Sequence, residues 1–97
     1  MKNVRTYAAN CLKEEAQAIM GLIPLLDDNF DKAVEMMYSC QGKVIVTGVG
    51  KSGHIGAKIA ATLSSTGTPS FFLNPLDAYH GDLGVVTSQD IVVGIGD

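Results

Sequence analysis

The chain has 97 residues, of which 46% are hydrophobic and 18% charged, enough for one globular domain or part of one. Ten acidic and seven basic residues give a net charge of -3, which provides no long-range attraction to nucleic acid or to an anionic membrane. No apolar stretch approaches the roughly 20 residues that span a bilayer, and the N-terminus lacks the apolar core of a signal peptide, so we expect a cytoplasmic protein.

The first forty residues predict two helices. Apolar side chains recur at spacings of three and four over residues 4–26, which is typical of one helix face, and Pro24 should bend or end this helix. The Asp-Asp-Asn sequence at 27–29 offers caps for a second helix, which Gly42 is placed to end. We therefore predict a helical hairpin over residues 1–41 that packs on a core or on another subunit.

Cysteine is sparse in the chain. Cys11 and Cys40 lie in different predicted helices, without the close spacing of a zinc or redox motif. We expect both to be plain buried thiols.

From residue 43 onward, short β-branched runs alternate with glycine-bearing loops and one helical stretch, as in parallel βαβ units. The pattern predicts strands over 43–48, 69–73 and 90–95, and a crossover helix over 52–65. The third strand shows no polar alternation, which is typical of a strand covered on both faces. The predicted fold class of residues 42–97 is α/β, with helices on the two sides of a parallel sheet. Small residues would let the crossover helix approach that sheet closely: Gly56, Ala57, Ala60 and Ala61.

The third predicted strand ends at Ile95, two residues before the chain does. An apolar strand with nothing after it would leave an exposed sheet edge, which complete domains avoid. We therefore expect an incomplete domain, truncated after this strand, or a domain that a partner completes.

Residues 48–58 form a glycine-rich passage from the first strand to the helix. They are not a nucleotide P-loop, because the first glycine of that motif would fall on Ile45, inside the strand. A G-x-G-x-x-G dinucleotide pattern begins at Gly48, but the next strand ends in Asn74 rather than in the acidic residue that holds a ribose. Two interpretations remain: a tight turn alone, or backbone N–H groups that attract an anion such as phosphate.

Polar side chains accompany this turn. Lys51 could neutralise a phosphate or an oxyanion, and Thr47 and Ser52 add hydroxyl donors. His80 follows the second strand and should reach the carboxyl edge of the sheet, where open α/β folds bind ligands. Lys51 and His80 could converge there, with the imidazole able to exchange protons near neutral pH. Alternatively, Lys51 is a solvated lysine and His80 a structural histidine.

The sequence motifs GKSGHIG, STGTPSFF and HGDLG, within residues 42–93, closely resemble the sugar isomerase (SIS) domain of the arabinose 5-phosphate isomerases. The resemblance implies a flavodoxin-like three-layer αβα sandwich of which three strands are present. It also implies interconversion of D-ribulose 5-phosphate and D-arabinose 5-phosphate through an enediol, for synthesis of the Kdo sugar of lipopolysaccharide. Family members are cytoplasmic and generally tetrameric, so the implied partners are a phosphorylated pentose and further copies of the chain.

The resemblance also implies roles for individual residues. Lys51 and His80 would be catalytic: Lys51 stabilises the enediolate, and His80 binds a substrate hydroxyl and assists ring opening or proton transfer. Besides His80, the substrate-binding residues would be Gly50, Ser52, Gly67 and Thr68.

Two departures from the family pattern qualify this hypothesis. Many members have a histidine, proposed as a metal ligand, where this chain has Asn74; an amide is a poor zinc ligand, so we expect neither a metal nor another cofactor. The family's serine-rich phosphate loop does not follow the third strand, since Gly96 stands where its first serine is usual. Residues 1–97 alone are therefore expected to be inactive. The alternative hypothesis is a non-enzymatic SIS domain that binds a phosphosugar and regulates a partner.

Overall fold

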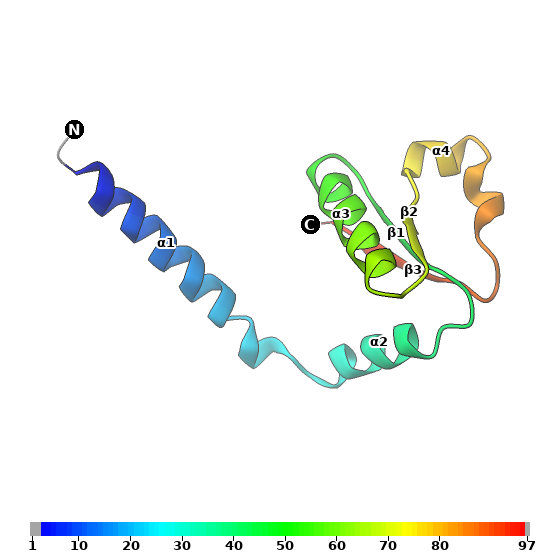
Figure 1. Cartoon of the computed structure of the whole chain (residues 1–97), viewed down its shortest axis with the longest axis horizontal. Helices are drawn as coiled ribbons and strands as arrows, with labels where there is room; N and C mark the ends of the chain where they lie inside the picture. The colour runs from blue at the N-terminus through cyan, green and yellow to red at the C-terminus, as the bar shows by residue number, and fades with distance from the viewer. Residues whose placement is uncertain (1–2, 97) are drawn as a thin grey trace. The chain divides into compact units, whose positions relative to one another are not determined.

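The computed structural model describes residues 3–96, the side chain of Asp82 excepted (Figure 1). These residues divide into two compact units between Val34 and Glu35. The chain begins with α1 (Val4–Met20), followed by the 3₁₀ helix η1 (Ile23–Leu25). Within the described part of the chain, no helix is both long enough and apolar enough to cross a membrane.

The ends of these N-terminal helices follow from local sequence signals. The first helix ends before Pro24, which occupies the first turn of η1, where a missing N–H costs nothing. Helix α2 (Asp28–Tyr38) begins beside Asp27, whose carboxylate accepts the N–H groups of Asn29 and Phe30 at 3.0 and 3.2 Å. This is the helix cap that the acidic run before Phe30 predicts. No residue of α1 is buried, so its apolar face has no cover within its own unit.

The second unit is built on a parallel sheet of three strands. They are β1 (Val44–Gly48), β2 (Ser70–Phe72) and β3 (Ile91–Ile95), in the order β2-β1-β3. All three predicted strands are present, with ends shifted by one residue or so. Because β1 lies in the centre, its side chains are covered on both faces, and three of them form the most buried part of the core: Val44, Ile45 and Val46.

Helix α3 (Lys51–Ser65) covers one face of this sheet. Its Ala60 packs with Val44 and Val46, and Leu63 and Phe72 border that cluster. The close approach that its small residues predict is confirmed at Gly56, where an added Cβ would lie 3.1 Å from Val46 Cγ1. The prediction is wrong for Ala57 and Ala61, which are exposed because they lie on the outer side of the helix.

The connection from β2 to β3 passes on the other side of the sheet, opposite α3 (Figure 1). It contains a short helix, α4 (Pro75–Tyr79), and the 3₁₀ helix η2 (Asp82–Val85). Right-handed crossovers require this arrangement, because the first connection runs from β1 to β2, whereas the second runs in the opposite direction, from β2 across β1 to β3. The predicted layers, helix on both sides of a parallel sheet, are therefore confirmed.

The third strand differs from its prediction. Its side chains alternate between half-buried and exposed, and Val92 is 53% exposed. The reason is the position of the strand. β3 lies at the edge of the sheet, and α3 packs on the face that carries Val93 and Ile95, whereas Val92 lies on the opposite face. An apolar sequence predicts a strand here, but it does not say that both faces are covered.

Asp90 joins the beginnings of β1 and β3. Its carboxylate accepts the N–H groups of Lys43 at 2.7 Å and Thr87 at 2.8 Å, and the Lys43 ammonium lies 3.5 Å away. These two backbone hydrogen bonds lower the pKa of Asp90 from 3.8 to about 2.

The sequence predicted that Gly42 ends α2, and this prediction is wrong. Gly42 instead belongs to the junction around Asp90. The helix ends at Tyr38, and the Gly42 N–H donates to Gln89 O at 3.1 Å. A Cβ at this position would collide with the Asp90 carboxylate. Nearby, the Cys40 thiol is half-buried and donates to Gln89 O, so it is less enclosed than predicted, as is Cys11.

Candidate functional site

The turn between β1 and α3 depends on three glycines for three different reasons. Gly50 has φ +62° and ψ -128°, a conformation that side chains disfavour. A Cβ on Gly53 would lie 2.7 Å from Gly48 O, and one on Gly48 would lie 2.9 Å from Ile95 O. The glycine pattern is thus required to bring the start of α3 against the ends of β1 and β3.

This close approach leaves the N-terminus of α3 open. No side chain caps the helix at Gly50, and the first hydrogen bond of the helix runs from His54 N to Gly50 O, at 3.2 Å. The amides before His54 have no acceptor within the helix, and the helix dipole makes this end attractive to an anion. The tight-turn and anion-site interpretations are therefore compatible, since one backbone conformation satisfies both.

Two adjoining cavities open at this carboxyl edge of the sheet. They share three residues, Gly48, Val49 and Pro75, and their volumes are about 430 and 460 Å³. The first is also lined by Thr47, Ser52, Gly94, Ile95 and Gly96. The second is also lined by Gly50, Asn74, Leu76 and Tyr79. The C-terminal ends of β1 and β3 and the segment that follows β2 thus line these walls, as expected for the ligand edge of an open parallel sheet.

The polar groups predicted for this edge have different surroundings. Lys51 is exposed at the first position of α3. The ion pair found among the described residues joins Lys43 to Asp90 and does not involve Lys51. Ser52 lines the first cavity. Thr47 also lines it, but its hydroxyl donates to Leu73 O at 2.6 Å and is therefore not a free donor for a ligand, contrary to the prediction.

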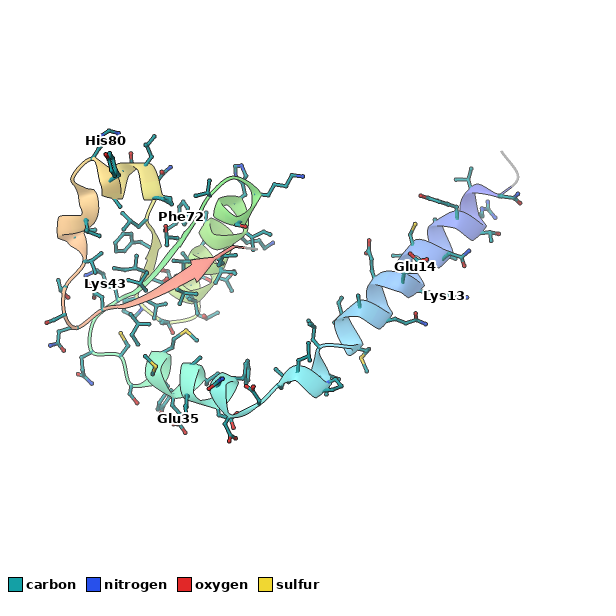
Figure 2. The ribbon with its side chains drawn as sticks, turned by 180° about the vertical axis from the view of Figure 1, so that it is seen from behind. Lys13, Glu14, Glu35, Lys43, Phe72 and His80 are labelled. Carbon is teal, nitrogen blue, oxygen red and sulfur yellow. The ribbon has the colours of Figure 1, made fainter. Side chains whose placement is uncertain are left out.

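His80 is held at the same edge of the sheet by α4. Figure 2 shows His80 on α4 at one end of the sheet, with Lys43 at the other. The sequence pattern predicted no helix between the second and third strands, although Asn-Pro is a recognisable start signal. Asn74 Oδ1 accepts the Leu76 N–H at 2.9 Å, and Pro75 occupies the first turn. His80 then ends the helix as its exposed C-cap.

Asn74 therefore has a structural role where the family resemblance places a metal-binding histidine. Among residues 3–96, no group of three His, Cys, Asp or Glu side chains could hold a metal ion. The residues that line the two cavities offer an amide and hydroxyls, which do not form the nitrogen or sulfur set that zinc prefers.

Tyr79 is an aromatic residue of this region that the sequence did not single out. Tyr79 lines the second cavity, and its ring makes an edge-to-face contact with the His80 imidazole, with ring centroids 5.3 Å apart and planes at 87°. The available signal was its place directly before the HGDLG motif, which begins at His80.

Gly67 and Thr68 lie at the opposite edge of the sheet. They precede β2, whose first residue pairs with Val44, the first residue of β1. There they line a separate cavity of about 310 Å³ with Tyr38, Cys40 and other residues that precede β1. The 15 residues of α3, at about 1.5 Å of rise each, separate this pair from Lys51 by about 20 Å. The structure thus brings Gly50, Ser52 and the α4 segment together, and it does not bring Gly67 and Thr68 to them.

Comparison with known proteins identifies related sequences and folds. A family model described as "SIS domain" matches residues 37–97. The arabinose 5-phosphate isomerase KdsD of Escherichia coli K12 is 56% identical over 81 residues, which are 84% of this chain and 25% of that protein. The arabinose 5-phosphate isomerase GutQ of Salmonella typhi is 54% identical over 81 residues, again 84% of this chain and 25% of that protein.

Solved structures support the same relationship. An E. coli CFT073 protein in complex with arabinose 5-phosphate superposes with a TM-score of 0.89 and 41% identity, covering 99% of this chain and 51% of that one. The chain therefore spans about a quarter of the length of the curated relatives that it matches, and about half of this solved chain.

Proposed function

The chain belongs to the family of SIS domains, and from this we propose that the full-length protein is an arabinose 5-phosphate isomerase. It would interconvert D-arabinose 5-phosphate and D-ribulose 5-phosphate through an enediol. The observation that carries the proposal is the 54–56% identity to enzymes of that name over 84% of the chain. The arabinose 5-phosphate complex of a related structure supports a phosphosugar ligand.

The carboxyl edge of the sheet suits part of this chemistry. The interconversion needs a base for a carbon-bound proton and a positive group beside the oxygen on which charge develops. We assign the second role to the Lys51 ammonium, with the open amides of α3 and the Ser52 hydroxyl as further donors. His80 would bind a substrate hydroxyl and assist ring opening or proton transfer. No Asp or Glu is among the described residues that line the two cavities, so we assign the base to a residue outside these walls.

Gly67 and Thr68 stay predicted substrate contacts, but their position sets a condition. A pentose phosphate is shorter than the distance of about 20 Å that α3 imposes between them and Lys51. For both sets to contact one sugar molecule, the Gly67–Thr68 pair would have to come from another copy of the chain. This agrees with the proposed homo-oligomer, a tetramer by family resemblance. The division into a helical segment, 1–41, and a partial SIS domain, 42–97, is likewise a proposal, as are a cytoplasmic location and a role in Kdo and lipopolysaccharide synthesis.

The competing hypothesis is a non-enzymatic SIS domain that binds a phosphosugar and regulates a partner. The absence of a carboxylate from the described cavity walls favours this function, because binding an anion needs no base.

One experiment separates the two functions. The full-length protein would be mixed with D-arabinose 5-phosphate, with ketose formation followed by chemical assay and binding by calorimetry. Turnover supports the isomerase, and binding without turnover supports the regulator. If the protein neither binds nor converts the sugar phosphate, both hypotheses are wrong.

A further inference from the structure

The edge-to-face contact between Tyr79 and His80 joins a cavity wall to a predicted catalytic side chain. Tyr79 is the last residue of α4, and His80 follows it as the C-cap. Because Tyr79 lines the 460 Å³ cavity and its ring contacts the imidazole, this residue connects His80 to the space beside the Gly48–Gly50 turn. We propose that Tyr79 is a positioning residue that holds the His80 imidazole at the rim of this cavity. The inference rests on the proposed function.

His80 needs such a contact, because little else in the described structure fixes its ring. Its backbone N–H bonds to Leu76 O and Asp77 O, both at 3.1 Å, which fixes the main chain at the end of α4. No hydrogen bond to its imidazole is present within residues 3–96, and the residue is exposed. An exposed side chain without a partner samples several rotamers, whereas catalysis needs one.

The geometry of the pair suits this role. Aromatic rings favour edge-to-face contact at centroid distances of roughly 4.5–7 Å, because the electropositive edge of one ring meets the electronegative face of the other. The observed 5.3 Å and 87° agree with this arrangement. Tyr79 is 84% exposed, so burial in a core does not explain an aromatic side chain at this position.

The backbone that carries both rings is fixed independently of them. The Asn74 carboxamide caps α4, and Pro75 presets its first turn. Replacing the Tyr79 ring should therefore alter the orientation of His80 without unfolding α4. This allows the positioning role to be tested separately from a structural one.

The test compares Tyr79→Ala, Tyr79→Leu and Tyr79→Phe in the full-length protein, each with and without His80→Ala. We expect kcat/KM for D-arabinose 5-phosphate to fall about 3- to 10-fold in Tyr79→Ala, mainly through kcat, since an edge-to-face pair has a strength of this order. Tyr79→Phe keeps the ring and should retain activity. Tyr79→Leu keeps the bulk of the side chain without the aromatic ring and should lose activity as Tyr79→Ala does. In the His80→Ala background, Tyr79→Ala should have no further effect. An equal fall in that background, or failure of Phe to rescue, would overturn the proposal.

A second measurement does not depend on turnover. The His80 ring protons, assigned in nuclear magnetic resonance spectra by their loss in His80→Ala, should lie in the ring current of Tyr79. Their shifts should move in Tyr79→Ala and Tyr79→Leu and stay in Tyr79→Phe. If the wild-type protein shows no isomerase activity, the proposed function fails, while these shifts still decide whether Tyr79 positions His80. Unchanged shifts in Tyr79→Ala would overturn the positioning role, whatever the activity.

Discussion

At the residue scale, the strand-to-helix turn shows how one motif combines backbone geometry with chemistry. Gly50 supplies a positive φ, and Gly53 supplies the space that lets α3 approach Gly48. The same approach leaves helix amides and the Lys51 ammonium at an open edge of the sheet. In the role proposed for it, Lys51 needs no ion-pair partner, because the fold leaves its charge accessible beside the anion-attracting helix end.

Replacing this charge tests its role directly. In the full-length protein, Lys51→Ala should reduce kcat for arabinose 5-phosphate isomerisation by about 100-fold or more, because removing one stabiliser of a developing oxyanion costs that much. Steady-state kinetics provide the measurement. Lys58→Ala is the matched control, since Lys58 is also an exposed lysine of α3 but lies about two turns further from the N-terminus of the helix. Similar losses in both variants would show that the net charge of the helix matters rather than the position of Lys51.

At the element scale, two contacts fix the layers of the α/β unit. Helix α3 approaches the sheet through Gly53, Gly56 and Ala60, which are its buried residues. At the amino edge, Asp90 connects the segment that precedes β3 to the beginning of β1. The first contact sets the distance between layers, and the second helps to set the register of β3 on β1.

Adding a side chain where α3 approaches the sheet should destabilise the α/β unit. Gly53→Ala would place a Cβ 2.7 Å from the Gly48 carbonyl oxygen, and backbone cannot yield as a flexible side chain can. We expect a loss of about 1–3 kcal/mol in the free energy of unfolding, as for overpacked cores. Urea denaturation measures this loss. Gly84→Ala, where nothing lies within 4 Å of the added Cβ, should stay within about 0.5 kcal/mol of wild type. Equal midpoints for the two variants would contradict the close-packing argument.

The Asp90 contact predicts a pH dependence with a defined sign. Since folding lowers the pKa of this carboxyl from 3.8 to about 2, its contribution to stability is fully present above about pH 4 and is lost as the pH falls toward 2. Asp90→Asn should therefore be less stable than wild type at pH 6, and the difference should shrink below pH 4. Urea midpoints between pH 6 and 2.5 measure it, with Glu35→Gln, an exposed carboxylate of α2, as the control. A difference that stays constant over this range would refute the assignment.

At the scale of the whole molecule, the sheet has two edges with different predicted groups. The carboxyl edge carries Lys51, Ser52 and the His80 segment, whereas the amino edge carries Gly67 and Thr68. The described cavity walls at the carboxyl edge supply hydroxyl, amide and backbone groups but no carboxylate base, and Lys51 lies exposed beside them at the start of α3.

Residues 1–97 by themselves should therefore bind a phosphosugar weakly and not isomerise it. The donors for an anion lie within this span, but the described cavities contain no carboxylate to remove the carbon-bound proton. Ketose formation from arabinose 5-phosphate, measured beside the full-length protein at equal concentration, tests this expectation. Turnover by residues 1–97 above the uncatalysed rate would contradict it.

The sequence by itself determined the principal elements and the family. Apolar periodicity located α1, α2, α3 and the three strands, because burial on one face imposes a local spacing. The motifs that surround Lys51 and His80 identified the family, which the match over residues 37–97 then confirmed.

Only the tertiary structure decided how distant segments meet. It paired Gly42 with the Asp90 junction, exposed Val92 on an edge strand, and separated Gly67 and Thr68 from Lys51. It also showed the contact of Tyr79 with His80 at the cavity wall. The physical reason is that local spacing determines which face of an element is apolar, whereas strand order and register determine which residues that face meets.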